Sequence, residues 1–159
     1  MINLIQFATM ERPGNYGWFH IMFIFIMLFG TIALCFFARN LKDKYFRIVI
    51  AAFWVVFLGL EIYKQLTFVW DGTQYQWYAF PFQFCSSPLY VLPFIAFLPE
   101  GKARQAFMAF ASLFVFFGGL AVYAFPNDVF VERTGINIQT MTHHGMQIVT
   151  GVFITIWNR

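Results

Sequence analysis

Five long stretches of apolar residues alternate with short polar segments along the chain. Each stretch is about 20 residues long, the length that an α-helix needs to cross a hydrocarbon core about 30 Å thick. The stretches lack the strict alternation of barrel strands, and backbone buried in lipid must satisfy its hydrogen bonds within a helix. The pattern therefore predicts transmembrane helices over residues 16–37, 46–70, 78–98, 105–125 and 137–157.

Short connections between these helices make sequential helices antiparallel neighbours. The composition agrees with a membrane bundle, because 60% of the residues are hydrophobic and only 11% are charged. A soluble fold of this size would lack the polar side chains to cover its surface. We therefore expect residues 1–159 to form one all-α, polytopic membrane domain.

Basic residues are concentrated on one side of the predicted bundle. Residues on that side are Arg39, Lys42, Lys44, Arg47, Lys102, Arg104 and Arg159. Cytoplasmic loops are enriched in Lys and Arg, so we expect the N-terminus outside, the C-terminus in the cytoplasm, and a multi-pass location in the cell membrane. A net charge of +3, scattered between apolar runs, argues against a nucleic-acid surface and leaves membrane lipids as the expected partners.

Ionisable and thiol side chains on four predicted helices fall at similar depths below the outer ends. At 1.5 Å per residue, these depths range from about 6 to 14 Å. The side chains are His20, Glu61, Lys64, Cys85, His143 and His144. A charge at mid-helix costs about 2.5 to 3.5 kcal/mol on insertion scales, so these groups should face the bundle interior and find partners. The sequence therefore predicts an intramembrane site near the outer face.

Glu61 and Lys64 are three residues apart, on one helical face, where a carboxylate and an ammonium can pair. Mutual neutralisation is one interpretation of the pair. The other is that the pair holds charge near a reacting group. His20, alone on its helix, is first interpreted as a hydrogen-bonding core residue.

The third predicted helix carries Cys85 in its most polar part, between Gln83 and Ser86. Pro88 has no backbone N–H and frees the carbonyl of Phe84, so a kink is expected beside the thiol. This setting favours a functional role for Cys85. The other cysteine, Cys35, lies among Phe and Ala and is interpreted as packing. Their different depths predict two free thiols.

The fifth predicted helix carries the adjacent residues His143 and His144. Thr140, His144, Gln147 and Gly151 follow three- and four-residue steps, which form one polar stripe and direct His144 inward better than His143. Adjacent residues diverge by about 100° around a helix and do not readily chelate one ion. We expect no metal and no cofactor.

A cysteine beside a histidine points to acyl transfer through a thioester, because the imidazole generates the thiolate and later protonates a leaving group. Phospholipid ester carbonyls lie at about the depth of these residues. The preferred hypothesis is a phospholipid acyltransferase or lipid hydrolase with Cys85 as nucleophile and His144, or secondarily His143, as base. Lys64 or Ser86 would stabilise the oxyanion.

Three other hypotheses stay open. A small-solute transporter or proton-coupled channel would use Glu, Lys and His residues, although the inner halves of the helices carry almost no ionisable side chain. A polar network could instead only specify helix packing. A metal hydrolase is weaker, because the chain lacks an HExxH-like step.

Three segments carry a family resemblance: LEIYKQ, FPFQFCSSPLYVLPF and THHGMQIV. They resemble the signature regions of YwaF-like integral membrane proteins, which are related to the transmembrane protein 164 family of animals. The matching residues are Glu61, Lys64, Pro81, Gln83, Cys85, His144 and Gly145. The resemblance implies an acyltransferase that acts on ether phospholipids, with Cys85 as nucleophile and His144, or secondarily His143, as base.

Two departures from this family pattern affect what we expect. Gln83 stands where many relatives have a histidine, which removes a titratable group. Relatives also usually continue into at least one more membrane helix. Completion of the bundle by a C-terminal helix or by a homo-oligomer is therefore expected.

Overall fold

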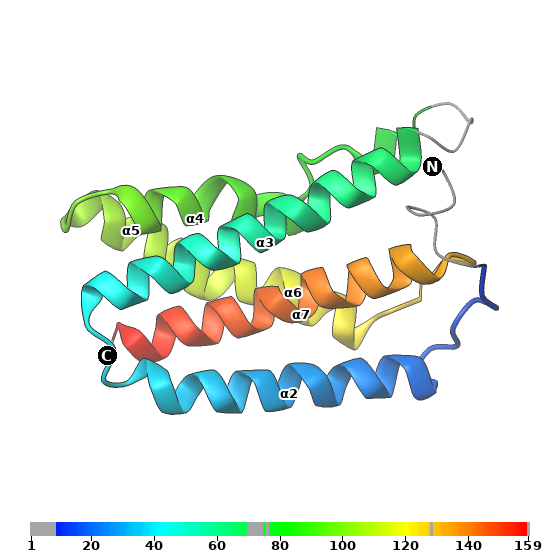
Figure 1. The fold of residues 1–159 in the computed structure, drawn as a ribbon, viewed down its shortest axis with the longest axis horizontal. Helices are drawn as coiled ribbons and strands as arrows, with labels where there is room; N and C mark the ends of the chain where they lie inside the picture. The colour runs from blue at the N-terminus through cyan, green and yellow to red at the C-terminus, as the bar shows by residue number, and fades with distance from the viewer. Residues whose placement is uncertain (1–8, 70–74, 76, 128, 159) are drawn as a thin grey trace.

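The structure is a computed structural model that describes residues 9–69, 75, 77–127 and 129–158. Its regular elements are helical (Figure 1). In chain order they are α2 (Trp18–Ala38), α3 (Asp43–Val69), η1 (Trp77–Ala79), η2 (Phe84–Ser86), α4 (Ser87–Phe97), α5 (Lys102–Phe110), the π-helical turn η3 (Ala111–Val115), α6 (Phe116–Ala124) and α7 (Thr134–Trp157). The predicted all-α class is confirmed.

The long helices run along the bundle in alternating directions (Figure 1). The connections from α2 to α3 and from α4 to α5 lie at the same end as the end of α7, so most of the predicted basic residues share one end of the bundle. Arg159 and residue 70, at the end of one predicted helix, lie outside the described residues. Which end faces the cytoplasm stays a prediction.

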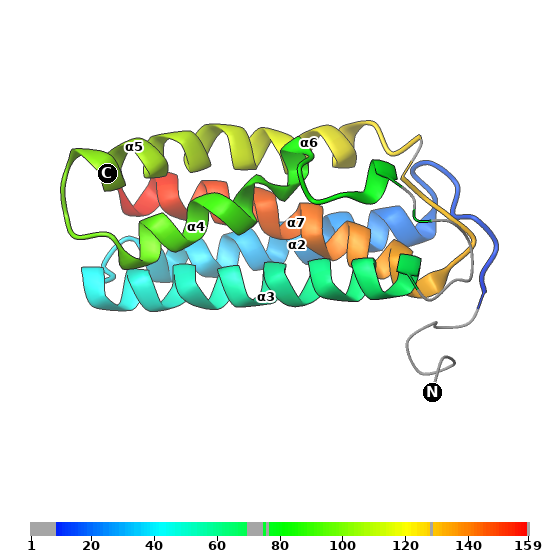
Figure 2. The same ribbon diagram turned by 90° about the horizontal axis from the view of Figure 1, so that it is seen from above.

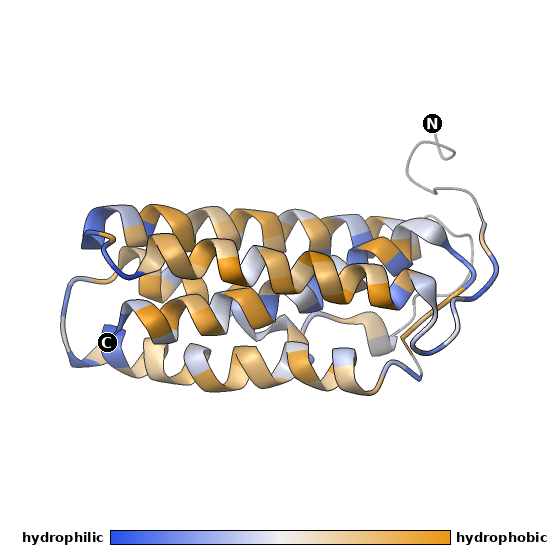
Figure 3. Ribbon diagram, turned by 90° about the horizontal axis from the view of Figure 1, so that it is seen from below, coloured by the Kyte–Doolittle hydropathy of each residue, from blue (hydrophilic) through white to orange (hydrophobic). Residues whose placement is uncertain are grey.

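Three helical stretches among the described residues are long and apolar enough to cross a membrane: Trp18–Ala38, Asp43–Val69 and Lys102–Ala124. Hydrophobic residues cover the middle of the bundle, and hydrophilic residues gather toward its ends (Figure 3). Large apolar side chains such as Phe29 and Phe36 of α2 are exposed, as a lipid-facing surface requires. These features are those of an integral membrane protein, and the predicted total of five spans stays a prediction.

The more polar helix α7 lies in the middle of the bundle and packs against α2, α3, η3 and α6 (Figures 1 and 2). Buried residues occur all around it, and Asn137, Gln147 and Thr150 are fully buried. Neighbouring helices shield these side chains from lipid, where an unsatisfied polar group would be costly. This position explains how a helix of lower hydropathy belongs to a membrane bundle.

Glycines allow the helices around α7 to approach it closely. A Cβ atom added at Gly119 of α6 would lie 2.3 Å from the backbone oxygen of His144. On α7 itself, a Cβ at Gly145 would lie 2.6 Å from the hydroxyl of Tyr123. The bundle therefore depends on the missing side chains at these two positions.

The prediction of one helix over 78–98 is wrong, because this segment consists of η1, a turn, η2 and the short helix α4. Pro88 lies in the first turn of α4, where a missing N–H costs little. The helix is thus interrupted beside Cys85 rather than only kinked. Carbonyls in the segment find side-chain donors: Trp54 Nε1 donates to Leu89 O at 3.1 Å, and the Tyr90 hydroxyl donates to Pro81 O at 2.6 Å. Pro93 has no N–H to offer Leu89, so Trp54 replaces that hydrogen bond.

A cluster at the basic end of the bundle joins four helices around Arg104. Its guanidinium pairs with Asp43 at 2.6 Å and donates to Ile95 O at 3.0 Å. It also lies 5.6 Å from the ring centroids of Phe46 and Trp157. Only 3% of Arg104 is exposed, so this residue, expected in a basic loop, is a structural anchor.

Candidate functional site

A cavity of about 790 Å³ lies among α3, η1, η2, α6 and α7. Its polar lining comes from α3, the segment around η2, and α7. These residues are Lys64, Gln83, Cys85, Gln139, Thr140, His143 and His144. The cavity falls within the range of about 300 to 1,000 Å³ that is typical of small-molecule sites. It is the natural candidate for a binding or active site.

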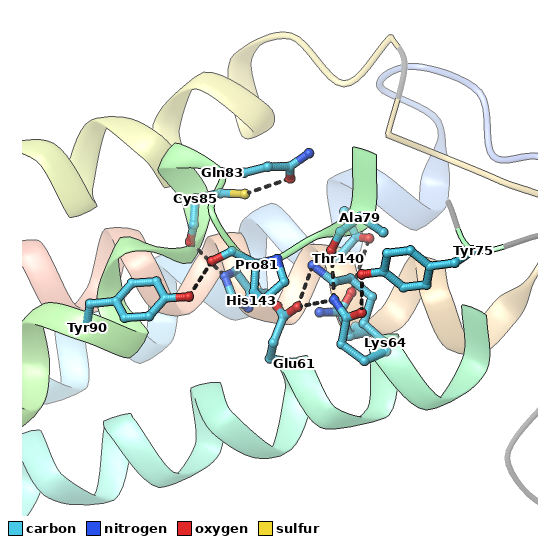
Figure 4. A network of polar contacts seen from close by, with 12 residues as sticks. Glu61, Lys64, Tyr75, Ala79, Pro81, Gln83, Cys85, Tyr90, Thr140 and His143 are labelled. Atoms are coloured by element: carbon cyan, nitrogen blue, oxygen red, sulfur yellow. Dashed lines mark hydrogen bonds and ion pairs between the residues drawn. The ribbon is translucent and has the colours of Figure 1, made fainter. Parts of the chain in front are cut away.

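The thiol of Cys85 lies on the short helix η2, where the interrupted helix leaves its backbone accessible to side chains. Its Sγ donates to Gln83 Oε1 at 3.4 Å (Figure 4). Its carbonyl oxygen accepts hydrogen bonds from His143 Nε2 at 3.0 Å and from Gln147 Nε2. Two side chains of α7 therefore hold the backbone of Cys85, while the side chain of Cys85 contributes to the cavity lining.

His143 is 3% exposed, and its ring packs edge-on against Phe57 at a centroid distance of 5.0 Å. Because Nε2 faces a carbonyl, it carries the proton and donates it. The other ring nitrogen, Nδ1, is buried and makes no hydrogen bond with the described residues. His143 thus contacts the main chain of Cys85 rather than its thiol.

His144 has the opposite tautomer. Its Nδ1 lies 2.8 Å from the carbonyl oxygen of Thr140, one turn earlier on α7, and must donate to it. The Nε2 atom is therefore the unprotonated nitrogen of the neutral ring. His144 lines the cavity together with Cys85, so an imidazole able to accept a proton and a thiol border the same space.

Glu61 and Lys64 form an ion pair of 2.9 Å, as the three-residue spacing predicted. Gln65 extends the pair into a network: its Nε2 donates to Glu61 Oε1 at 2.6 Å and to Ala79 O at 2.7 Å (Figure 4). The hydroxyl of Tyr75 donates to Gln65 Oε1 at 2.7 Å. The network ties α3 to the η1 segment, and Lys64 also lines the cavity.

The structure brings together most, but not all, of the residues that the sequence singled out. Residues that line the cavity are Lys64, Gln83, Cys85, His143 and His144. Gln147 lies behind Cys85 at its carbonyl, and Glu61 lies behind Lys64.

His20 and Ser86 are not part of the cavity lining either. His20 is fully buried beside the rings of Tyr16, Tyr123 and Phe130. His20 belongs to a different part of the bundle, because α2 packs against the side of α7 that lies opposite α3 (Figure 1). Ser86 is also fully buried, and its hydroxyl makes no hydrogen bond with the described residues.

Sequence reasoning missed several participants. Gln65 follows Glu61 by four residues, so helical spacing was a usable signal for it. Thr140 was expected on the polar stripe of His144, but the hydrogen bond between its carbonyl and that ring was not expected. The apolar part of the cavity, which includes Phe117, Gly118 and Ala121 of α6, had no such signal. An apolar helix in a membrane protein looks the same whether it faces lipid or a cavity.

Comparison with known proteins adds one finding. The model of the TMEM164 family matches residues 15–159, which include every helix described above. No curated protein and no solved structure matches the chain. The match covers the ion pair of α3, the cysteine of η2 and the histidines of α7 in one continuous alignment range. The chain is therefore an integral membrane protein that belongs to the TMEM164 family.

Proposed function

We propose that this protein transfers acyl groups from phospholipids through a thioester on Cys85, with His144 as general base and acid. The observation that carries this proposal is the common cavity, which Cys85, His144 and Lys64 all line. Cysteine needs a proton acceptor to become the reactive thiolate, and the Nε2 atom of His144 is unprotonated. A lipid hydrolase that uses water as the acceptor is the same chemistry with a different second substrate.

In the first step, rotation about the Cα–Cβ bond turns Sγ from Gln83 toward the substrate, and His144 takes the thiol proton. Sγ attacks the ester carbonyl, and a thioester forms as the carbon–oxygen bond breaks. The proton on His144 passes to the departing alkoxide, which leaves as a lysophospholipid. In the second step a hydroxyl group of an acceptor lipid, or water, attacks the thioester while His144 takes its proton, and the thiol is restored.

Lys64 is the proposed electrostatic partner of the oxyanion, since its ammonium group carries a positive charge and the residue lines the cavity. Ser86 is less suited to that role because it does not line the cavity. Glu61 keeps Lys64 in place through the 2.9 Å ion pair. Preorganised charge next to a developing oxyanion contributes about 3 to 4 kcal/mol in well-studied enzymes.

His143 and Gln147 are proposed to position the nucleophile rather than to exchange protons with the substrate. Their hydrogen bonds fix the carbonyl of Cys85 at the point where the helix is interrupted. His143 was the second candidate for the general base, but its protonated nitrogen donates a hydrogen bond to this carbonyl. The two adjacent histidines therefore have separate proposed roles.

The test is a thioester assay on the purified protein in vesicles of diacyl phospholipid and lysophospholipid. Intact mass spectrometry should detect an acyl adduct on Cys85 that hydroxylamine removes. The adduct should be absent in Cys85→Ala and retained in the matched control Cys35→Ser. Acyl transfer to the lysophospholipid should fall by about 10² or more in His144→Asn. An unmodified Cys85 together with unchanged lipids would exclude the proposal.

The transporter and packing hypotheses predict other outcomes in the same vesicles. Solute or proton flux that is lost in Glu61→Gln and kept in Cys85→Ala would support transport. A purely structural network would change unfolding in both variants without any adduct or flux. The contacts of Gln65 with both Glu61 and the η1 segment favour a structural contribution for that side chain.

A further inference from the structure

The cavity has two chemically different walls. Facing the polar groups of η2 and α7, helix α6 contributes Phe117, Gly118, Ala121 and Val122, all without polar side-chain atoms. Val131 and Ile136 extend this apolar surface. A solute with a single polar end and a long apolar body would match this division.

The cavity lining reaches the exposed surface of the bundle. Two lining residues, Phe84 of η2 and Phe117 of α6, are 53% and 51% exposed. Exposed phenylalanines between helices of a membrane bundle contact acyl chains rather than water. A lipid chain can therefore pass between these rings without leaving the hydrocarbon region.

Small residues keep the α6 wall open between these rings and the interior. Gly118 and Ala121 are one turn apart and both line the cavity. A Cβ added at Gly118 would lie 3.5 Å from the Phe84 ring and from Gln147 Oε1, which is ordinary contact distance. A methyl group fits there, and any larger side chain takes up cavity space or displaces Phe84.

We propose that the apolar α6 wall binds the acyl chain of the substrate, and that Gly118 and Ala121 determine which chain lengths reach Cys85. This inference rests on the proposed function for the identity of the chain, and on the cavity lining for its location. The chain enters past Phe84 and Phe117 and lies along α6. Its carbonyl end reaches the thiol on the polar wall.

The test uses alkyl methanethiosulfonates with methyl, octyl or hexadecyl groups, which need no catalysis by the protein. The Cys85 thiolate attacks the sulfenyl sulfur, a disulfide to the alkylthio group forms, and methanesulfinate leaves. A Cys35→Ser background makes Cys85 the single thiol of the chain. The measured quantity is the labelling rate with the hexadecyl reagent divided by the rate with the methyl reagent. Division by the same ratio for the background protein removes the effect of reagent partitioning into micelles.

Ala121→Leu should lower this ratio by about tenfold, as expected if roughly two methylene groups lose their place against the wall. Gly118→Leu should also lower it. The matched control is Ala109→Leu, on the same membrane-spanning stretch but outside the cavity lining, and it should leave the ratio unchanged. A variant that reacts with the methyl reagent at the rate of the background protein is folded around Cys85. If Gly118→Leu fails this check, the test uses Ala121→Leu alone.

Unchanged ratios in the folded α6 variants, or an equal fall in Ala109→Leu, would overturn the inference. A ratio that falls in a protein without any thioester would leave a chain-binding cavity and exclude the acyl-transfer mechanism. A thioester with unchanged ratios would retain the mechanism and exclude this wall. The two proposals therefore fail separately.

Discussion

The Nε2–H group of His143 donates a hydrogen bond of 3.0 Å to the carbonyl oxygen of Cys85, so a residue of α7 holds the main chain of a residue 58 positions earlier. Gln147 donates to the same oxygen. Pro88, three residues after Cys85, has no N–H to donate to this oxygen, and the side chains of α7 supply donors to it instead. Helix α7 thus positions the main chain that carries the thiol.

Replacement of His143 by alanine should destabilise the protein by about 1 to 3 kcal/mol, because a buried carbonyl loses one of its two donors. Thermal unfolding in detergent measures this loss. His143→Gln, which can still donate, should recover part of it. Full stability of His143→Ala would contradict the positioning role.

His144 should control the pH dependence of Cys85 alkylation. With Nε2 as the proton acceptor, His144→Gln should slow alkylation of Cys85 at neutral pH and remove the imidazole inflection from the pH–rate profile. His143→Gln should slow the reaction without removing that inflection. If His143→Gln removes the inflection and His144→Gln retains it, the two roles are reversed.

Lys64→Met should be among the most damaging single substitutions. It leaves the carboxylate of Glu61, which is 5% exposed, without its cation, and breaking a buried ion pair costs about 3 to 5 kcal/mol. The double variant Glu61→Gln with Lys64→Met should recover much of this loss, because neither charge remains buried alone. Chemical unfolding in micelles tests the series, and a double variant as unstable as Lys64→Met would argue against the charge explanation.

Gly119→Ala should destabilise the packing of α6 on α7. The new methyl group would lie 2.3 Å from the backbone oxygen of His144, and a backbone atom cannot move aside alone. Strain from overpacking is typically about 1 to 3 kcal/mol. Gly59→Ala is the matched control, because no atom lies within 4 Å of its added Cβ and helix propensity favours alanine by about 1 kcal/mol. Opposite shifts in melting temperature are expected.

Arg104→Ala should lower the melting temperature, whereas Lys102→Ala should have little effect. Arg104 is buried and joins Asp43, Ile95 O and two aromatic rings, while Lys102 is exposed. Arg104→Lys should recover only part of the stability, because an ammonium lacks the planar fork that serves several partners at once. Equal melting temperatures for Arg104→Ala and Lys102→Ala would show that the cluster contributes little.

Helical spacing predicted the pairing of Glu61 with Lys64, because residues three apart face each other on any α-helix. The same reasoning expected His144 to be better directed toward the interior than His143, whereas the structure buries His143, leaves His144 half-buried, and gives the two rings different hydrogen-bond partners. It also grouped His20 with the site by depth alone. Depth along a helix does not specify which neighbour a side chain faces, and α2 carries His20 to another side of α7.

The sequence by itself determined that the chain is a helical membrane protein with a layer of ionisable residues, since apolar length and the cost of buried charge are properties of each segment alone. Only the tertiary structure decided that His143 holds the backbone of Cys85, that His144 borders the cavity, and that part of α6 forms an apolar wall. These features depend on how each helix is rotated about its axis and on which helix packs beside it. Hydropathy does not encode that rotation in a helix that is apolar on every face.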